Sequence, residues 1–154
     1  MGLSMRRCLL LISLLLAVAS ARAGEWLVRL DGRQQFAVNI TMRGIQLSGI
    51  CIVKTDEEGS RGAIVNEFGF HALDFTISAD RRKVKLLNVL PQMDRWYVKR
   101  VVRGDLKHLF SATEAGRQKG RRVVSVDDEG TVTLKNERYK LTYSLKKIED
   151  ETGE

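Results

Sequence analysis

The sequence predicts a mainly β protein of the α+β class: a curved, antiparallel, open half-barrel of seven or eight strands with one long lid helix at about residues 92–110. Alternating apolar and polar residues recur in short segments, which is typical of strands that bury one face. Polar or glycine-containing turns separate these segments and favour sequential antiparallel hairpins. One stretch changes to helical periodicity, and a helix there would cover the apolar face of a sheet long enough to curl.

Residues 1–23 are predicted to be a cleavable signal peptide rather than part of the fold. Two arginines at positions 6 and 7 precede an apolar run over residues 8–18, and the small-residue motif Ala21-Arg22-Ala23 follows it. This order is typical of secretory signal peptides, and the run is shorter than the roughly 20 apolar residues that span a membrane. Cys8 stands at the start of the apolar run instead of following it, so we expect no lipid anchor.

The predicted mature chain is one domain, residues 24–148, followed by an acidic tail at 149–154. The signal segment carries three arginines and no acidic residue, so its removal lowers the net charge from +7 to +4. A modest positive charge favours acidic surfaces such as anionic lipid head groups, and export argues against nucleic acid as a partner. Cys51 then has no cysteine to pair with, and its apolar neighbours predict a small buried side chain.

Five strands are predicted before the helix. In the first, Phe36, Val38 and Ile40 alternate with polar neighbours, and Arg43-Gly44 forms the following turn. The other four are residues 47–54, 62–66, 73–77 and 84–89.

The predicted helix is amphipathic. Its apolar face carries Val98, Val101, Val102, Leu106 and Leu109. Its opposite face carries Lys99, Arg100, Arg103 and Lys107. This basic face fits either contact with an anionic surface or simple solvation, which is the usual state of the polar side of such a helix. Asp105 falls inside the apolar arc, and the sequence reveals no partner for it.

After the helix, residues 111–120 are small, polar and basic, which predicts a flexible loop. Strands are expected at residues 121–126 and 131–135. The last strand shows the cleanest alternation, with apolar positions at Tyr139, Leu141, Tyr143 and Leu145. At the start of the domain, residues 26–30 fit either a strand or a short helix.

Enzyme chemistry is not indicated, and no catalytic residue, metal ligand or cofactor site is predicted. The sequence has no nucleophile elbow, no paired-cysteine or zinc-protease motif and no phosphate-binding glycine loop. Cys51 and His71, on neighbouring predicted strands, are the nearest approach to a nucleophile and its base. His71 and Asp74 are three residues apart in a strand, so they are expected to point to opposite faces and not to share a metal.

A resemblance supports this outline. Its residues are the strand Leu47-Ser48-Gly49-Ile50-Cys51-Ile52-Val53-Lys54, an acidic turn, Ile64-Val65-Asn66-Glu67-Phe68-Gly69-Phe70, Leu73-Asp74-Phe75 and a helix with Asp105-Leu106 and Leu109-Phe110. This segment, about half of the mature chain, resembles small envelope proteins similar to the outer-membrane lipoprotein carrier and receptor proteins, the LolA/LolB-like superfamily. The resemblance implies a half-barrel with an apolar cavity under a helical lid, which the carrier and receptor use for lipoprotein acyl chains. The chain departs from them in having no lipobox, one clear lid helix and a shorter length than the typical carrier.

The first functional hypothesis is an exported binding protein of the periplasm or outer-membrane periphery that holds a lipid acyl chain or a lipoprotein. The residues expected to line its cavity are Phe36, Val38, Ile40, Leu73, Phe75, Ile77, Val102 and Leu106. The residues expected to contact an anionic membrane surface are Lys99, Arg100, Arg103 and Lys107. The alternative is a non-enzymatic envelope adaptor or structural protein with a packed core and no lipid. A cavity of hundreds of Å³ favours the first, and water-sized voids favour the second.

Overall fold

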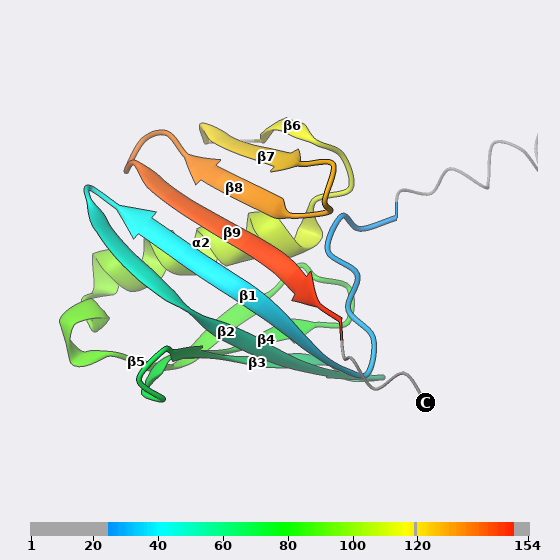
Figure 1. The fold of residues 1–154 in the computed structure, drawn as a ribbon, viewed down its shortest axis with the longest axis horizontal. Coiled ribbons are helices and arrows are strands. Elements are labelled where there is room, and N and C mark those ends of the chain that lie inside the picture. The colour runs from blue at the N-terminus through cyan, green and yellow to red at the C-terminus, as the bar shows by residue number, and fades with distance from the viewer. Residues whose placement is uncertain (1–24, 119, 150–154) are drawn as a thin grey trace, which may run out of the picture.

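The computed structural model describes residues 25–118 and 120–149 (Figure 1). The predicted signal peptide and all of the predicted acidic tail except Glu149 lie outside the described residues. The strands are β1 (Arg33–Met42), β2 (Ile45–Asp56), β3 (Gly59–Asn66), β4 (His71–Ser78), β5 (Val84–Val89), β6 (Gly116–Gln118), β7 (Arg122–Val126), β8 (Val132–Asn136) and β9 (Leu141–Ile148). Between β5 and β6 lie a short 3-10 helix, η1 (Pro91–Met93), and the helix α2 (Trp96–Ser111).

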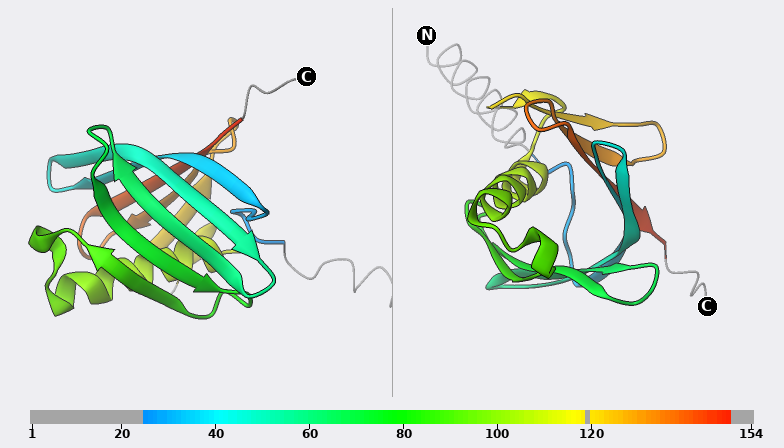
Figure 2. Two further views of the ribbon diagram at one scale, coloured as in Figure 1. Left: turned by 90° about the horizontal axis from the view of Figure 1, so that it is seen from below. Right: turned by 90° about the vertical axis from the view of Figure 1, so that its left-hand side faces the viewer.

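All nine strands form one antiparallel sheet in the order β5-β4-β3-β2-β1-β9-β8-β7-β6. Two series of hairpins meet where β1 pairs with β9, so the first and last strands lie side by side in the middle of the sheet. The sheet curves without closing, and Figure 2 shows α2 in the gap between its two edge strands, β5 and β6. The predicted mainly β, open half-barrel with one helix is therefore confirmed for the described residues.

The prediction of a flexible loop at residues 111–120 is wrong for part of that range. Gly116–Gln118 forms β6, which pairs with β7 and raises the number of strands above the predicted seven or eight. The segment lacks apolar alternation, so its strand conformation depends on the backbone hydrogen bonds that β7 offers. Residues 26–30 form neither of the elements that the sequence left open, and the Leu27 amide instead donates to the Ala112 carbonyl over 2.8 Å.

The helix begins four residues later than predicted. Pro91 starts the 3-10 turn η1 instead, because proline is suited to the first position of a helix. Arg95 then has extended backbone (φ −119°, ψ 136°), which separates η1 from α2. The predicted end at residue 110 is one residue short of the observed end at Ser111.

A bulge in β4 changes which side chains share a face of the sheet. Ile64 of β3 pairs with Leu73 and Val65 pairs with His71, so Ala72 is an extra residue. Two consecutive residues, Ala72 and Leu73, are buried as a result. The prediction that His71 and Asp74 point to opposite faces is therefore wrong: His71 Nδ1 lies 3.1 Å from an Asp74 carboxylate oxygen.

Gly62 of β3 lets the ring of Phe75 lie flat against the sheet. A Cβ at position 62 would lie 2.3 Å from Phe75 Cζ, and Phe75 is fully buried. Gly62→Ala is therefore expected to lower the free energy of unfolding by about 1–3 kcal/mol through overpacking, measured by denaturant unfolding. In a Phe75→Leu background the same substitution should cost less, because the overlapping ring atoms are gone. An equal cost in both backgrounds would contradict this contact.

Candidate functional site

The inner faces of β1 and β2 change from buried to exposed along their length. On β1, Phe36 and Val38 are buried, while Met42 on the same face is 42% exposed. On β2, Val53 is fully buried and Ile45 is 68% exposed. Because Met42 pairs with Ile45 at the tip of this hairpin, both gradients run toward the same end of the half-barrel.

An apolar pocket of about 450 Å³ opens at that end, between α2 and the sheet. The right-hand view of Figure 2 faces this end of the molecule. The walls include Ile40, Leu47, Leu73, Val98, Val101 and Val102. The exposed side chains at its opening, called here the mouth, include Met42, Ile45, Tyr97 and Tyr139. Its volume lies in the range of about 300–1,000 Å³ that is typical of ligand pockets, far above a water-sized void.

The unequal lengths of β2 and β3 leave room for this pocket. The last residue of β3, Asn66, pairs with Gly49, so the first part of β2 (residues 45–48) pairs with β1 alone. The connection from β5 to α2 passes on that side, where Leu90 and Met93 line the pocket. The sheet therefore packs against the helix at one end, whereas at the other end β3 stops short of β2 and leaves the pocket open.

The eight predicted cavity residues divide between the pocket and the packed core. Three of them line the pocket: Ile40, Leu73 and Val102. The other five lie in the core and do not line it: Phe36, Val38, Phe75, Ile77 and Leu106. The sequence places Val98 and Val101 on the apolar face of the helix but does not identify them as cavity residues. Their position on that face is the sequence signal that could have identified them. Tyr139, predicted to begin the last strand, lies in the turn before β9.

Asp105 of α2 is fully buried and holds the helix to the C-terminal half of the sheet. Its carboxylate accepts hydrogen bonds from Arg122 Nε of β7 at 2.7 Å, Asn136 Nδ2 of β8 at 2.8 Å and the Tyr143 hydroxyl of β9 at 2.8 Å. Burial first, and then the Asp105 carboxylate, raise the pKa of Tyr143 well above its usual value. Tyr143 also lines the pocket, so this network fixes one pocket wall.

Gly104 gives Arg122 access to this network. A Cβ at position 104 would lie 2.7 Å from Arg122 Nη2. A glycine in a helix costs about 1 kcal/mol relative to alanine, and the close approach of the guanidinium group explains why one is present here. The residue with a low helix propensity thus lies where the helix is most tightly held.

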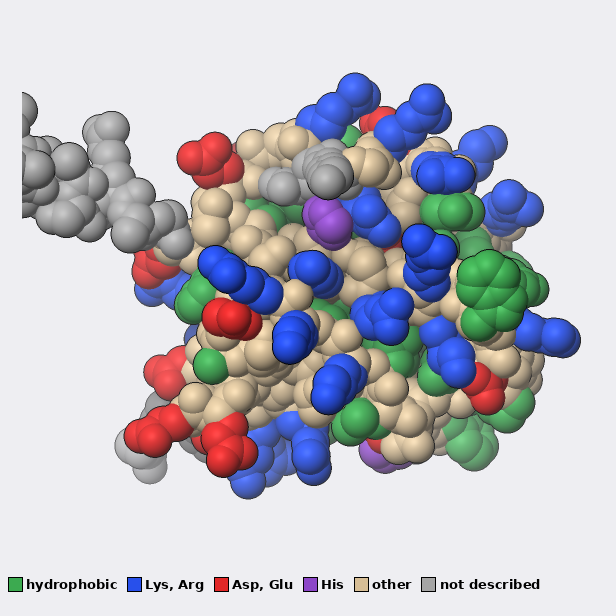
Figure 3. All heavy atoms as spheres, turned by 180° about the vertical axis from the view of Figure 1, so that it is seen from behind, with side chains coloured by type: hydrophobic (Ala, Val, Ile, Leu, Met, Phe, Trp, Pro, Cys, Tyr) green, Lys and Arg blue, Asp and Glu red, His purple; other side chains and the backbone are tan. Residues whose placement is uncertain are grey.

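The four predicted membrane-contact cations lie along the outer side of α2. Arg100, Arg103 and Lys107 are exposed, and Lys99 forms an ion pair with Asp94 at 2.8 Å. Figure 3 looks at this side of the molecule and shows many basic side chains spread over it. An exposed ion pair of this kind contributes little to stability, about 0–1 kcal/mol.

A second, wider hollow of about 1000 Å³ lies on the outer face of β2 to β5. Its lining is mixed, with Lys54, Lys85, His71 and Asp74 among apolar and small residues. Burial alone would raise the pKa of Asp74, but the hydrogen bonds donated by Asn88 at 2.8 Å and shared with His71 lower it below its usual value. In the part of the chain that the structure describes, no three His, Cys, Asp or Glu side chains gather as metal ligands. The apolar pocket is therefore the better candidate site.

Cys51 and His71 do not form a nucleophile and base. Cys51 is buried on the inner face of β2, and burial raises the pKa of its thiol to about 12. His71 is exposed on the outer face of β4, beside Asp74. At neutral pH the thiol stays protonated, so its role is that of a small core side chain.

Fold and site together define a class of protein: an open antiparallel half-barrel with an apolar pocket beneath one helix. Neither a scan against protein-family models nor a search of curated proteins finds a match to this chain. The likeness to the lipoprotein carrier and receptor proteins therefore stays a prediction. Among the described residues, no helix has the length and apolar character needed to cross a membrane.

Proposed function

We propose that this protein is an exported, non-catalytic binding protein that holds a hydrophobic ligand, such as the acyl chain of a lipid or of a lipoprotein. The observation that carries the proposal is the apolar pocket of about 450 Å³ under α2. Burying apolar surface in such a pocket gains about 25 cal/mol per Å². The packed core, as expected for an adaptor, does not fill this space, and core members such as Leu73, Val102 and Tyr143 form part of its wall.

The polar groups at the mouth favour an amphiphilic ligand over a purely apolar one. Arg43 and the ring of Tyr97 line the pocket where it opens to solvent. A ligand with its apolar chain among the valines of α2 would place its head group beside Arg43. A guanidinium group binds phosphate or carboxylate well, so the supported ligand class is a single-chain or acylated amphiphile with an anionic head group.

Export places this activity in the periplasm or at the periphery of the outer membrane. The support is the predicted signal peptide together with the resemblance of residues 47–110 to the lipoprotein carrier and receptor proteins. The proposed role is participation in the movement of lipids or lipoproteins through the envelope.

The test fills the pocket without disturbing the core. Val98→Trp places an indole group at a half-buried wall position. We expect binding of a lysophospholipid, measured by native mass spectrometry, to weaken by at least about tenfold, the factor that corresponds to about 1.4 kcal/mol of steric overlap. Circular dichroism checks that the fold is kept.

The matched control is Val126→Trp, which makes the same change at an exposed position at the opposite end of the molecule. This variant should bind the lysophospholipid as the unmodified protein does. If the unmodified protein takes up no lysophospholipid, the binding proposal is wrong and the envelope adaptor is favoured. Equal binding by both variants would place the ligand outside the pocket.

A further inference from the structure

The mouth of the pocket is surrounded by exposed apolar side chains. Met42, Ile45, Trp96, Tyr97 and Tyr139, together called the mouth rim, are each at least 40% exposed. All of them except Trp96 line the pocket, and Trp96 packs edge-on against Tyr97 with ring centroids 5.9 Å apart. Figure 3 shows apolar side chains gathered at this end, on the right, among basic ones. A gathered exposed apolar patch marks a surface that another body covers.

Three turns bring cations to the same end. Residues that pair in successive strands form one row across the sheet: Gln118, Arg122, Asn136, Leu141, Met42 and Ile45. The turns that hold Arg43, Arg121 and Lys140 join these strands next to that row, so they lie along one border of the sheet. All three residues have positive φ, of 45°, 64° and 54°. Glycine adopts such a conformation at lower cost than any other residue, so the backbone does not account for a cation at these positions.

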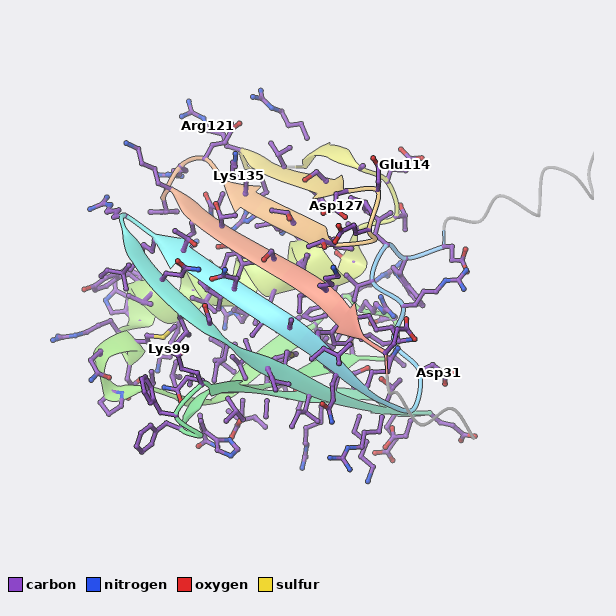
Figure 4. The ribbon with its side chains drawn as sticks, viewed as in Figure 1. Asp31, Lys99, Glu114, Arg121, Asp127 and Lys135 are labelled. Carbon is purple, nitrogen blue, oxygen red and sulfur yellow. The ribbon has the colours of Figure 1, made fainter. Side chains whose placement is uncertain are left out.

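The charges of the molecule are divided between its two ends. Two of the three turns at the far end are acidic, with Asp56, Glu57 and Glu58 in one and Asp127, Asp128 and Glu129 in the other, while the turn of Asp80 also carries Arg82 and Lys83. Figure 4 shows the division in its labelled residues: Lys99 and Arg121 lie toward the mouth, and Asp31, Glu114 and Asp127 lie toward the opposite end. A negatively charged surface would therefore attract the mouth more strongly than the far end.

We propose that the mouth rim docks on an anionic lipid bilayer, with its aromatic and aliphatic side chains in the head-group region and the pocket opening directly against the lipid. The use of this docking rests on the proposed function, because an acyl chain could then pass between bilayer and pocket without crossing water. Tryptophan and tyrosine favour the interface between membrane and water, and cations nearby add attraction to anionic lipids. The prediction of membrane contact through the helix face thus changes to contact through the end of the half-barrel.

Charge distinguishes a bilayer from a second copy of the chain. Two copies that met mouth to mouth would bring Arg43, Arg121 and Lys140 of each against the same cations of the other. Like charges across an interface oppose association, whereas phosphate-bearing lipids complement them. A bilayer is therefore the occupant that the rim fits.

The first experiment removes the cations and keeps the backbone. The triple variant Arg43→Gly, Arg121→Gly and Lys140→Gly should retain its turns, because glycine suits positive φ. Flotation with phosphatidylcholine vesicles that contain phosphatidylglycerol should show binding weakened on the order of a hundredfold, at about fivefold per cation. The control neutralises three exposed cations at the far end, Arg33, Arg82 and Lys83, each to glutamine, and should bind as the unmodified protein does.

The second experiment reads the depth of insertion. The sequence contains two tryptophans, so Trp26→Phe leaves Trp96 as the only one. On anionic vesicles Trp96 fluorescence should shift to the blue and be quenched by brominated lipids, and Ile45→Ser should weaken both effects. All variants keep the same N-terminal segment, so differences between them report the rim alone. Equal binding to vesicles without phosphatidylglycerol, or an unquenched Trp96, would overturn the proposal. Self-association that the rim substitutions abolish, without vesicle binding, would overturn it in favour of a second copy.

The two proposals can fail separately. Val98→Trp should lose lysophospholipid uptake and keep vesicle binding. The double variant Arg121→Gly and Lys140→Gly, which keeps Arg43 at the pocket, should do the reverse. Vesicle binding without any uptake of lysophospholipid would reject the ligand proposal and support docking. Uptake without vesicle binding would reject docking alone.

Discussion

Replacing Asp105 with alanine is expected to lower the free energy of unfolding by about 3–5 kcal/mol, the largest effect of a single substitution considered in this protein. The carboxylate is fully buried and accepts hydrogen bonds from Arg122, Asn136 and Tyr143. Its removal leaves a guanidinium group that is only 17% exposed without its anion, and two buried donors without an acceptor. Denaturant unfolding followed by circular dichroism measures the loss.

Asp94→Ala is the matched control, because Asp94 forms an exposed ion pair with Lys99. It should change the free energy of unfolding by less than about 1 kcal/mol. In a Cys8→Ser background the labelling of Cys51 by a thiol reagent provides a second readout, since the buried thiol reacts only when the structure opens. Asp105→Ala should accelerate that labelling and Asp94→Ala should not. Similar stability of the two variants would contradict the role assigned to the buried network.

Replacing Arg81 with methionine is expected to lower the free energy of unfolding by about 2–4 kcal/mol. Arg81 is buried, and its Nη1 donates to the carbonyl oxygens of Val28 at 2.6 Å and Phe110 at 2.8 Å. Its guanidinium group also lies 3.9 Å from the centre of the Trp26 ring. The substitution leaves two carbonyl groups without this donor, and it leaves the hydrogen bond from the Leu27 amide to the Ala112 carbonyl to hold the segment before β1 at the end of α2.

Arg82→Met is the control for this prediction, because the neighbouring arginine is exposed. A Trp96→Phe background leaves Trp26 as the only tryptophan, and its fluorescence should shift to the red in Arg81→Met alone. Burial lowers the pKa of Arg81 to about 10, so the side chain remains charged at neutral pH. The stability and the fluorescence measurements therefore both compare a charged arginine with an uncharged methionine. An unshifted spectrum with unchanged stability would show that the N-terminal segment is held by other contacts.

Local patterns in the sequence predict most of the strands, because a strand that buries one face alternates apolar and polar residues along its length. β9 is the clearest case, with Leu141, Tyr143 and Leu145 all buried. β6 was missed because its three residues carry no such pattern. The bulge at Ala72 was missed because an extra residue in one strand is visible only against the register of its neighbour.

The candidate site is harder to predict, because it depends on residues that are distant in sequence. Asp105 stands out as an acid among apolar residues, yet its partners Arg122, Asn136 and Tyr143 lie 17, 31 and 38 residues away. The division of the inner face into core and pocket follows from β2 being longer than β3. Phe36 and Ile40 occupy equivalent positions in the same alternation, and only the lengths of neighbouring strands decide which is packed.

The packed part of the interior gives the pocket a back wall. Beyond Leu73 the next inward residue of β4 is Phe75, whose ring lies 5.7 Å from that of Phe110, and beyond Val102 the next turn of α2 presents Leu106. Under the proposed function, an acyl chain that entered at the mouth would meet these side chains and could go no further. The bulk of these few core residues would then set how many carbons of the chain fit inside the half-barrel. Smaller residues at the positions of Phe75, Phe110 and Leu106 would enlarge the pocket, so that the same fold could bind longer chains.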